Sequence, residues 1–200
     1  MLDVVRIPSL PMSLSWLRPP VAWGLDGAEL AIRAGAETDW FVDPSGGEPV
    51  TNGPALVGRP PDEDFMLLAR VRIDATSTFD AGVLFVHGHE RAWAKLCLER
   101  SPQATPMIVS VVTRDVSDDC NSEPLVAQEA WLRIAKLGSA FAFHTSDDGR
   151  SWRLVRYFAL PAREVAVGFE AQSPTGPGCT ATFDQIAYSA GRLVDLRGGS

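Results

Sequence analysis

Glycine and proline interrupt this chain at short intervals, so its apolar segments are too short to form long helices. The 200 residues include 17 glycines and 15 prolines, and the runs between them are rich in Val, Ile, Phe and Trp. No segment keeps a 3.6-residue apolar period beyond about two helical turns. Short β-branched and aromatic runs between turn residues are typical of strands. The pattern predicts strands at Glu29–Ala34, Trp40–Val42, Phe65–Ile73, Gly82–Val86, Ala92–Glu99, Met107–Arg114, Ala130–Lys136, Phe141–Thr145, Arg153–Ala159, Glu164–Ala171 and Thr180–Tyr188.

Many short strands in one chain of this length predict an all-β fold, an antiparallel two-sheet sandwich of jelly-roll type. The strand spacing continues through Gly/Pro turns without a linker, so we expect a single domain over residues 1–200. Within it, residues 1–27 are expected to be a lead-in that packs along the sandwich, and residues 191–200 a loosely held tail. A chain of this size buries roughly 70 % of its unfolded surface, which is enough for one core without disulfides or a metal.

The composition argues against several classes of function. The net charge is −7 and no Lys/Arg cluster is present, which argues against nucleic-acid binding. Neither a long apolar stretch nor a secretory signal pattern occurs, so we expect no membrane association and a cytoplasmic location. Three widely spaced cysteines, Cys97, Cys120 and Cys179, indicate reduced thiols. No phosphate loop or dinucleotide-binding motif is found, and no cofactor is expected.

One predicted strand has a half-polar face. Alternation along Ala92–Glu99 places Trp93, Lys95, Cys97 and Glu99 on the same side. This side is either a solvated sheet face on which Lys95 pairs with its neighbours, or the wall of a concave groove. In a groove, indole rings would stack on sugar rings while charged groups and amides bind the hydroxyls.

Other predicted strands carry compatible residues. Glu170 and Gln172 share one face of their strand, and Arg114 lies at the end of another. His144 alternates with Phe141 and Phe143, so it is expected to point away from the core that these rings form. An isolated histidine of this kind is more often structural than catalytic. Six Trp against two Tyr is an unusual ratio, and Trp40, Trp93 and Trp131 fall on strands beside charged residues.

Catalytic and metal-binding motifs are weak. Glycoside hydrolysis needs two carboxyl groups roughly 5 to 10 Å apart, and the strand that ends at Glu99 carries no second acid at a suitable spacing. Asp39, Asp80 or Glu170 could pair with Glu99 across strands. The segments 87–90 and 118–121 could offer metal ligands, but both are better interpreted as turns, so no metal site is expected.

Several stretches resemble the lectin-like family of regulation-of-enolase type proteins, over the span Thr38–Tyr188. The stretches are TDWFVDP from Thr38, DAGVL from Asp80, WAKLCLE from Trp93, IVSVVTRDVSDDCNS from Ile108 and VGFEAQSP from Val167. This family is similar to the concanavalin A-like lectin and glucanase superfamily. The resemblance implies a curved two-sheet jelly roll with a concave face and a link to carbohydrate metabolism or to protein partners, and it carries no activity over.

The candidate ligand-binding residues lie in these stretches, apart from His144. They are Asp39, Trp40, Trp93, Lys95, Glu99, Arg114, His144 and Gln172. Our leading hypothesis is a non-catalytic, lectin-like module that binds a glycan or another polyhydroxylated molecule. Two alternatives remain: a glycoside hydrolase-like enzyme that uses Glu99 with a cross-strand acid, and a regulatory domain in sugar metabolism that binds a protein partner.

Overall fold

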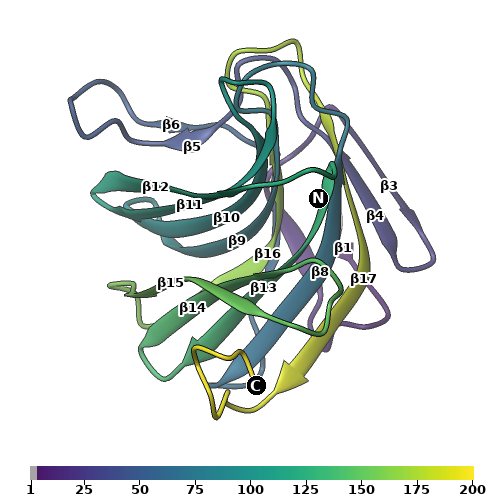
Figure 1. Cartoon of the computed structure of the whole chain (residues 1–200), viewed down its shortest axis with the longest axis vertical. Coiled ribbons are helices and arrows are strands. Elements are labelled where there is room, and N and C mark those ends of the chain that lie inside the picture. Colours follow the sequence, from purple (N-terminus) through teal and green to yellow (C-terminus); the bar gives the residue numbers. More distant parts are fainter. Residues whose placement is uncertain (1–3) are drawn as a thin grey trace.

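The computed structural model describes residues 4–200 and confirms an all-β sandwich of two large antiparallel sheets (Figure 1). The eight-stranded sheet contains, in spatial order, β1 (Val4–Val5), β2 (Leu14–Arg18), β7 (Ala55–Gly58), β16 (Ala166–Gln172), β9 (Ala81–His89), β10 (Ala92–Arg100), β11 (Pro106–Arg114) and β12 (Val116–Pro124). The seven-stranded sheet contains β15 (Arg153–Ala159), β14 (Ala140–Ser146), β13 (Glu129–Leu137), β8 (Phe65–Ile73), β17 (Thr180–Ala190), β4 (Glu29–Arg33) and β3 (Ala22–Asp26). A small third sheet pairs β5 (Trp40–Phe41) with β6 (Val50–Thr51). No helix capable of crossing a membrane is found in the described part of the chain.

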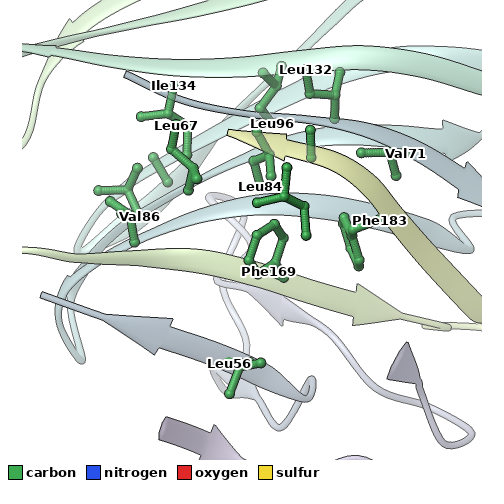
Figure 2. Packing of buried hydrophobic residues seen from close by; sticks show 14 of the residues in the cluster. Leu56, Leu67, Val71, Leu84, Val86, Leu96, Leu132, Ile134, Phe169 and Phe183 are labelled. Atoms are coloured by element: carbon green, nitrogen blue, oxygen red, sulfur yellow. The ribbon is translucent and has the colours of Figure 1, made fainter. Parts of the chain in front are cut away.

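The main core lies between the two large sheets. Along β8, buried and partly exposed side chains alternate at every position, as expected for a strand with one face in a core. Figure 2 shows Leu67, Val71 and Phe183 from the seven-stranded sheet near Leu84 and Phe169 from the other sheet. The period-2 pattern in the sequence therefore sets which face of each strand enters the core.

The eight-stranded sheet is buried on its outer face as well. Most positions of β9 and β10 are buried regardless of which way they point. The segment 36–53, which contains β5 and β6, covers part of this face and is held to β12 by hydrogen bonds between Val42 and Ser117 (2.9 Å for each N–H donor). Figure 1 shows the β5–β6 hairpin beside β12. A second apolar cluster results, with Trp40, Val42, Ala55, Val57, Ala81, Val83, Phe85, Trp93, Cys97, Val109 and Val111.

Both chain ends differ from the expectation. The lead-in 1–27 supplies β2, which pairs with β7, and β3, which pairs with β4. Leu14 and Trp16 are buried and alternate with the exposed Ser15, a pattern that the surrounding prolines and serines hide. The tail 191–200 is held to the seven-stranded sheet, because Arg133 Nη2 donates to the carbonyl oxygen of Gly199 (2.9 Å).

Candidate functional site

A small pocket opens on the outer face of the eight-stranded sheet, next to the covering segment 36–53. Its volume is about 140 Å³, several times the space that one water needs and less than the roughly 300 Å³ at which drug-sized ligand sites begin. The lining residues are Asp39, Phe41, Phe79, Lys95, Glu99, Val111, Asp119 and Gln172. The pocket thus has the size for a small polar molecule such as one sugar ring.

Strand register brings these side chains together. Glu99 on β10 and Gln172 on β16 both pair with Ala81 of β9, which lies between them. In the other direction, Lys95 pairs with Val111, which pairs with Asp119 on β12. Neighbouring strands lie about 4.8 Å apart, so residues two strands apart on the same face are within reach of long side chains.

Lys95 is the centre of a buried hydrogen-bond network. Its side chain is 2 % exposed, and Nζ donates to Asp39 Oδ1 (2.7 Å) and to Gln172 Oε1 (2.7 Å). Gln172 Nε2 in turn donates to the carbonyl oxygen of Phe79 (3.2 Å). Burial acts most strongly and lowers the pKa of Lys95, but Asp39 and the other acidic groups around it together outweigh burial, so the pKa is raised overall. An ammonium has three N–H donors, so one remains without a partner among the described residues.

Two carboxyl groups near Lys95 are buried without hydrogen bonds. Glu99 lines the pocket and is 8 % exposed, and burial raises its pKa to about 8 despite the opposing charge of Lys95. Glu170 is completely buried, neither of its oxygens has a hydrogen-bond partner, and burial raises its pKa to about 8 as well. Glu170 faces Gly53 and Trp40 instead of the pocket, since a Cβ on Gly53 would lie 2.7 Å from Glu170 Oε1. Both carboxyl groups are therefore mainly protonated at neutral pH.

The structure brings together four of the eight candidate residues, Asp39, Lys95, Glu99 and Gln172. Trp40 and Trp93 share the same sheet face, but they are 3 % and 0 % exposed and pack edge to face with ring centroids 5.8 Å apart. Trp40 Nε1 donates to the carbonyl oxygen of Gly53 (2.8 Å). The stacking role expected of these indoles does not fit the structure, because the covering segment seals them in.

Arg114 and His144 lie away from the pocket. Arg114 is exposed and faces Asp118 at 3.7 Å. His144 belongs to β14 in the opposite sheet and is completely buried. Its Nε2 is hydrogen-bonded to the carbonyl oxygen of Leu196 (2.8 Å), and burial lowers its pKa to about 4. The alternation did place His144 on the face away from the main core, but the tail covers that face.

Four pocket residues were not among the candidates: Phe41, Phe79, Val111 and Asp119. Phe41 and Phe79 supply apolar surface, and Phe79 is 38 % exposed with a left-handed backbone (φ 69°). Asp119 was interpreted as part of a turn, but it lies on β12, an edge strand too polar to be recognised by its composition. A signal in the sequence could have indicated the sheet face on which Asp119 lies. In a strand, Asp119 and Asn121 point to one face, and Asp118 and Cys120 point to the other.

The chemistry of the pocket is that of polar recognition. It offers one free N–H donor from Lys95, the carboxyl groups of Glu99 and Asp119, and two phenyl rings. Burial raises the pKa of Asp119 as well. Within residues 4–200, no group of three or more His, Cys, Asp or Glu side chains is placed to hold a metal ion.

Comparison with known proteins gives one family and one fold. Residues 16–190 match the family described as "Protein of unknown function (DUF1349)". The protein named "Regulation of enolase protein 1" from Saccharomyces cerevisiae is 25 % identical over 178 residues, which cover 88 % of this chain and 89 % of the relative.

Two solved structures show the same fold. A functionally unknown protein from Saccharomyces cerevisiae superposes with a TM-score of 0.83 at 24 % identity, over 90 % of this chain and 97 % of that one. The GH43 BlXynB protein from Bacillus licheniformis superposes with a TM-score of 0.71 at 14 % identity, over 89 % of this chain and 37 % of that one. At these identities the likeness concerns the fold, and it agrees with the β-sandwich described above.

Proposed function

The chain belongs to the DUF1349 family, and from its pocket we propose that it is a non-catalytic binding module for a carbohydrate or another small polyhydroxylated molecule. The observation that carries this proposal is the preorganised Lys95–Asp39–Gln172 network beside the carboxyl group of Glu99, in a pocket of about 140 Å³.

A sugar ring matches the groups that the pocket presents. Each hydroxyl can donate and accept hydrogen bonds, so one can accept the free N–H of Lys95 and another can bond the carboxyl group of Glu99. Phe41 and Phe79 offer apolar surface for the face of the ring. Because Lys95 is held by two short hydrogen bonds, its ordering cost is met before the ligand arrives.

A glycoside hydrolase-like activity is the first alternative, and the raised pKa of Glu99 favours it because a general acid must be protonated. Binding fits better, since two of the acids that could act with Glu99 are not available to a substrate. Asp39 is ion-paired with Lys95, and Glu170 does not line the pocket. Release of nitrophenol from aryl glycosides, abolished in Glu99→Gln, would favour the enzyme over the binding module.

Regulation through a protein partner is the second alternative, favoured by the name of the yeast relative, "Regulation of enolase protein 1". In such a role, the partner would bind to a surface outside the pocket, or a ligand bound in the pocket would control whether the partner binds. Direct binding of this chain to purified enolase, measured with and without sugar, would separate the two arrangements.

The binding proposal is tested by thermal midpoints and calorimetry of the full chain against a panel of mono- and disaccharides. At least one sugar should raise the midpoint of the wild type, because a ligand that binds only the folded state stabilises it. Phe79→Ala, at the half-exposed rim, should weaken that binding by roughly fivefold to tenfold. The matched control is Tyr157→Ala, an exposed aromatic on β15, which should bind like the wild type. No midpoint shift with any sugar in the wild type would refute the proposal.

A further inference from the structure

We propose that the pocket selects a ligand that carries an ammonium group beside its hydroxyls, such as an amino sugar. This inference rests on the proposed binding function and specifies the chemistry of the ligand. It follows from the charges that line the pocket and from one buried group that lacks a partner.

Three acidic residues and one cation line the pocket. Lys95 is the single cation among the lining residues, and its charge is engaged by Asp39 at 2.7 Å. Glu99 and Asp119 also line the pocket, and neither has an ion-pair partner within the described residues. Arg156 and Arg114 instead lie against Asp118, the neighbouring position, at 2.8 Å and 3.7 Å. A cationic ligand can therefore be accommodated by loss of the proton from Glu99, whereas an anionic ligand meets no cation that is free of an ion-pair partner among the lining residues.

Glu99 provides the second, independent observation. Its side chain is more than nine-tenths buried and lines the cavity, yet it accepts no hydrogen bond from any described residue. Unlike the oxygens of Glu170, those of Glu99 are not sealed from solvent, so a ligand in the pocket can supply the partner that the described residues do not. A charged N–H donor is the strongest partner for a carboxylate.

The groups are arranged for a molecule with two kinds of polar substituent. The free N–H of Lys95 can donate to a hydroxyl oxygen but would repel an ammonium. Glu99 lies four residues further along the same strand and lines the same pocket, and Lys95 is bonded to Asp39 and Gln172 instead of to Glu99, so Glu99 is the group that can accept an ammonium. Because burial holds the pKa of Glu99 near 8, binding of a cation would favour its ionised form and release a proton at neutral pH.

The experiment is calorimetry of the full chain at pH 7 with matched pairs that differ in one substituent. The pairs are glucosamine against glucose, galactosamine against galactose, and cyclohexylamine against cyclohexanol. We expect at least one amino sugar to bind about tenfold or more tightly than its hexose, because charge-assisted hydrogen bonds are roughly twice as strong as neutral ones. N-acetylation, which removes the charge, should abolish the preference.

Variants locate the effect. Glu99→Gln keeps the size of the side chain and should reduce the preference to within about twofold. The control is Glu90→Gln, the same chemical change at an exposed site at the other end of the β9–β10 hairpin, and it should keep the preference of the wild type. Circular dichroism and the thermal midpoint show whether each variant is folded.

The outcomes separate this inference from the binding proposal. If hexoses bind as tightly as their amino sugars, or if glucuronate binds more tightly, the inference is overturned and sugar binding stands. If cyclohexylamine binds through Glu99 and no sugar binds, the ammonium site is supported and the carbohydrate proposal falls. If none of the probes binds, both are overturned.

Discussion

Replacing Glu170 by Gln should stabilise the protein, and the gain should grow with pH. Glu170 is completely buried and its carboxyl oxygens have no hydrogen-bond partner. Burial raises its pKa in the folded state from the ordinary 4.5 to about 8. Gln has nearly the same shape and carries no charge at any pH, so it resembles the protonated Glu170 that the folded state prefers.

The sign follows from the number of protons that each state binds. Between pH 4.5 and about 8 the folded wild type keeps the proton on Glu170 while the unfolded chain has lost it. The unfolding free energy of the wild type therefore falls as pH rises, by about 1.4 kcal/mol per pH unit. The part of the unfolding free energy that depends on protonated Glu170 is fully present below pH 4.5. It falls as the pH rises from 4.5 and is lost once the pH passes 8. The variant lacks this loss, so its advantage should be near zero at pH 4 and reach roughly 5 kcal/mol above pH 8.

Urea unfolding at each unit from pH 4 to pH 9 measures the difference between the two chains. Glu99, whose pKa is also about 8, contributes a similar slope to both chains, so the difference isolates Glu170. Glu90→Gln, at an exposed position, should differ from the wild type by a small amount that does not change with pH. A stability difference for Glu170→Gln that is independent of pH, or a loss of stability at pH 8, would refute the reasoning.

Three further predictions concern packing. Trp93→Ala should lower the unfolding free energy by about 3–5 kcal/mol in urea unfolding, because Trp93 is buried beneath the covering segment; a loss below about 1 kcal/mol would show that the segment leaves the indole in contact with water. Gly168→Ala should abolish the folded state or destabilise it by about 3 kcal/mol or more, because the new Cβ would collide with the carbonyl oxygen of Leu56; near-wild-type circular dichroism and stability would contradict the close approach of β16 to β7. Deletion of residues 191–200 should destabilise the chain by about 1–3 kcal/mol, since Arg133 loses a buried acceptor. The same deletion should raise the pKa of His144 from about 4 toward its ordinary value in an NMR titration, and an unchanged pKa would mean that the tail is not what buries it.

Strand positions were predictable because local patterns cause them. Buried and exposed side chains along β8 alternate as its sequence does, and every predicted strand occurs in the structure. Six strands were not predicted, β1, β2, β3, β6, β7 and β12, and in two of them the composition hides the pattern. β2 lies among prolines and serines, and β12 is an edge strand made mostly of polar residues. Edge strands carry few core contacts, so their composition says little about pairing.

The candidate site was predicted in part for the same reason. The half-polar face of β10 placed Lys95 and Glu99 on one side from alternation alone, and the structure keeps them there. The role of Trp93 on that face depended on burial, which alternation does not determine. The segment 36–53 folds over the indole from a distant part of the chain, and local sequence does not show what will cover an exposed strand face.

The sequence by itself determined the class of fold and the faces of most strands, because both follow from a two-residue period and from turn residues that act locally. The tertiary structure alone decided the composition of the pocket. Lys95 reaches Asp39 and Gln172 only because β9 lies between β10 and β16, and because the segment 36–53 closes over their outer face. Strand order and long-range covering depend on the sum of contacts across the whole chain. The same distant contacts placed His144 in the opposite sheet and buried both tryptophans, leaving a polar pocket where the sequence had predicted an aromatic groove.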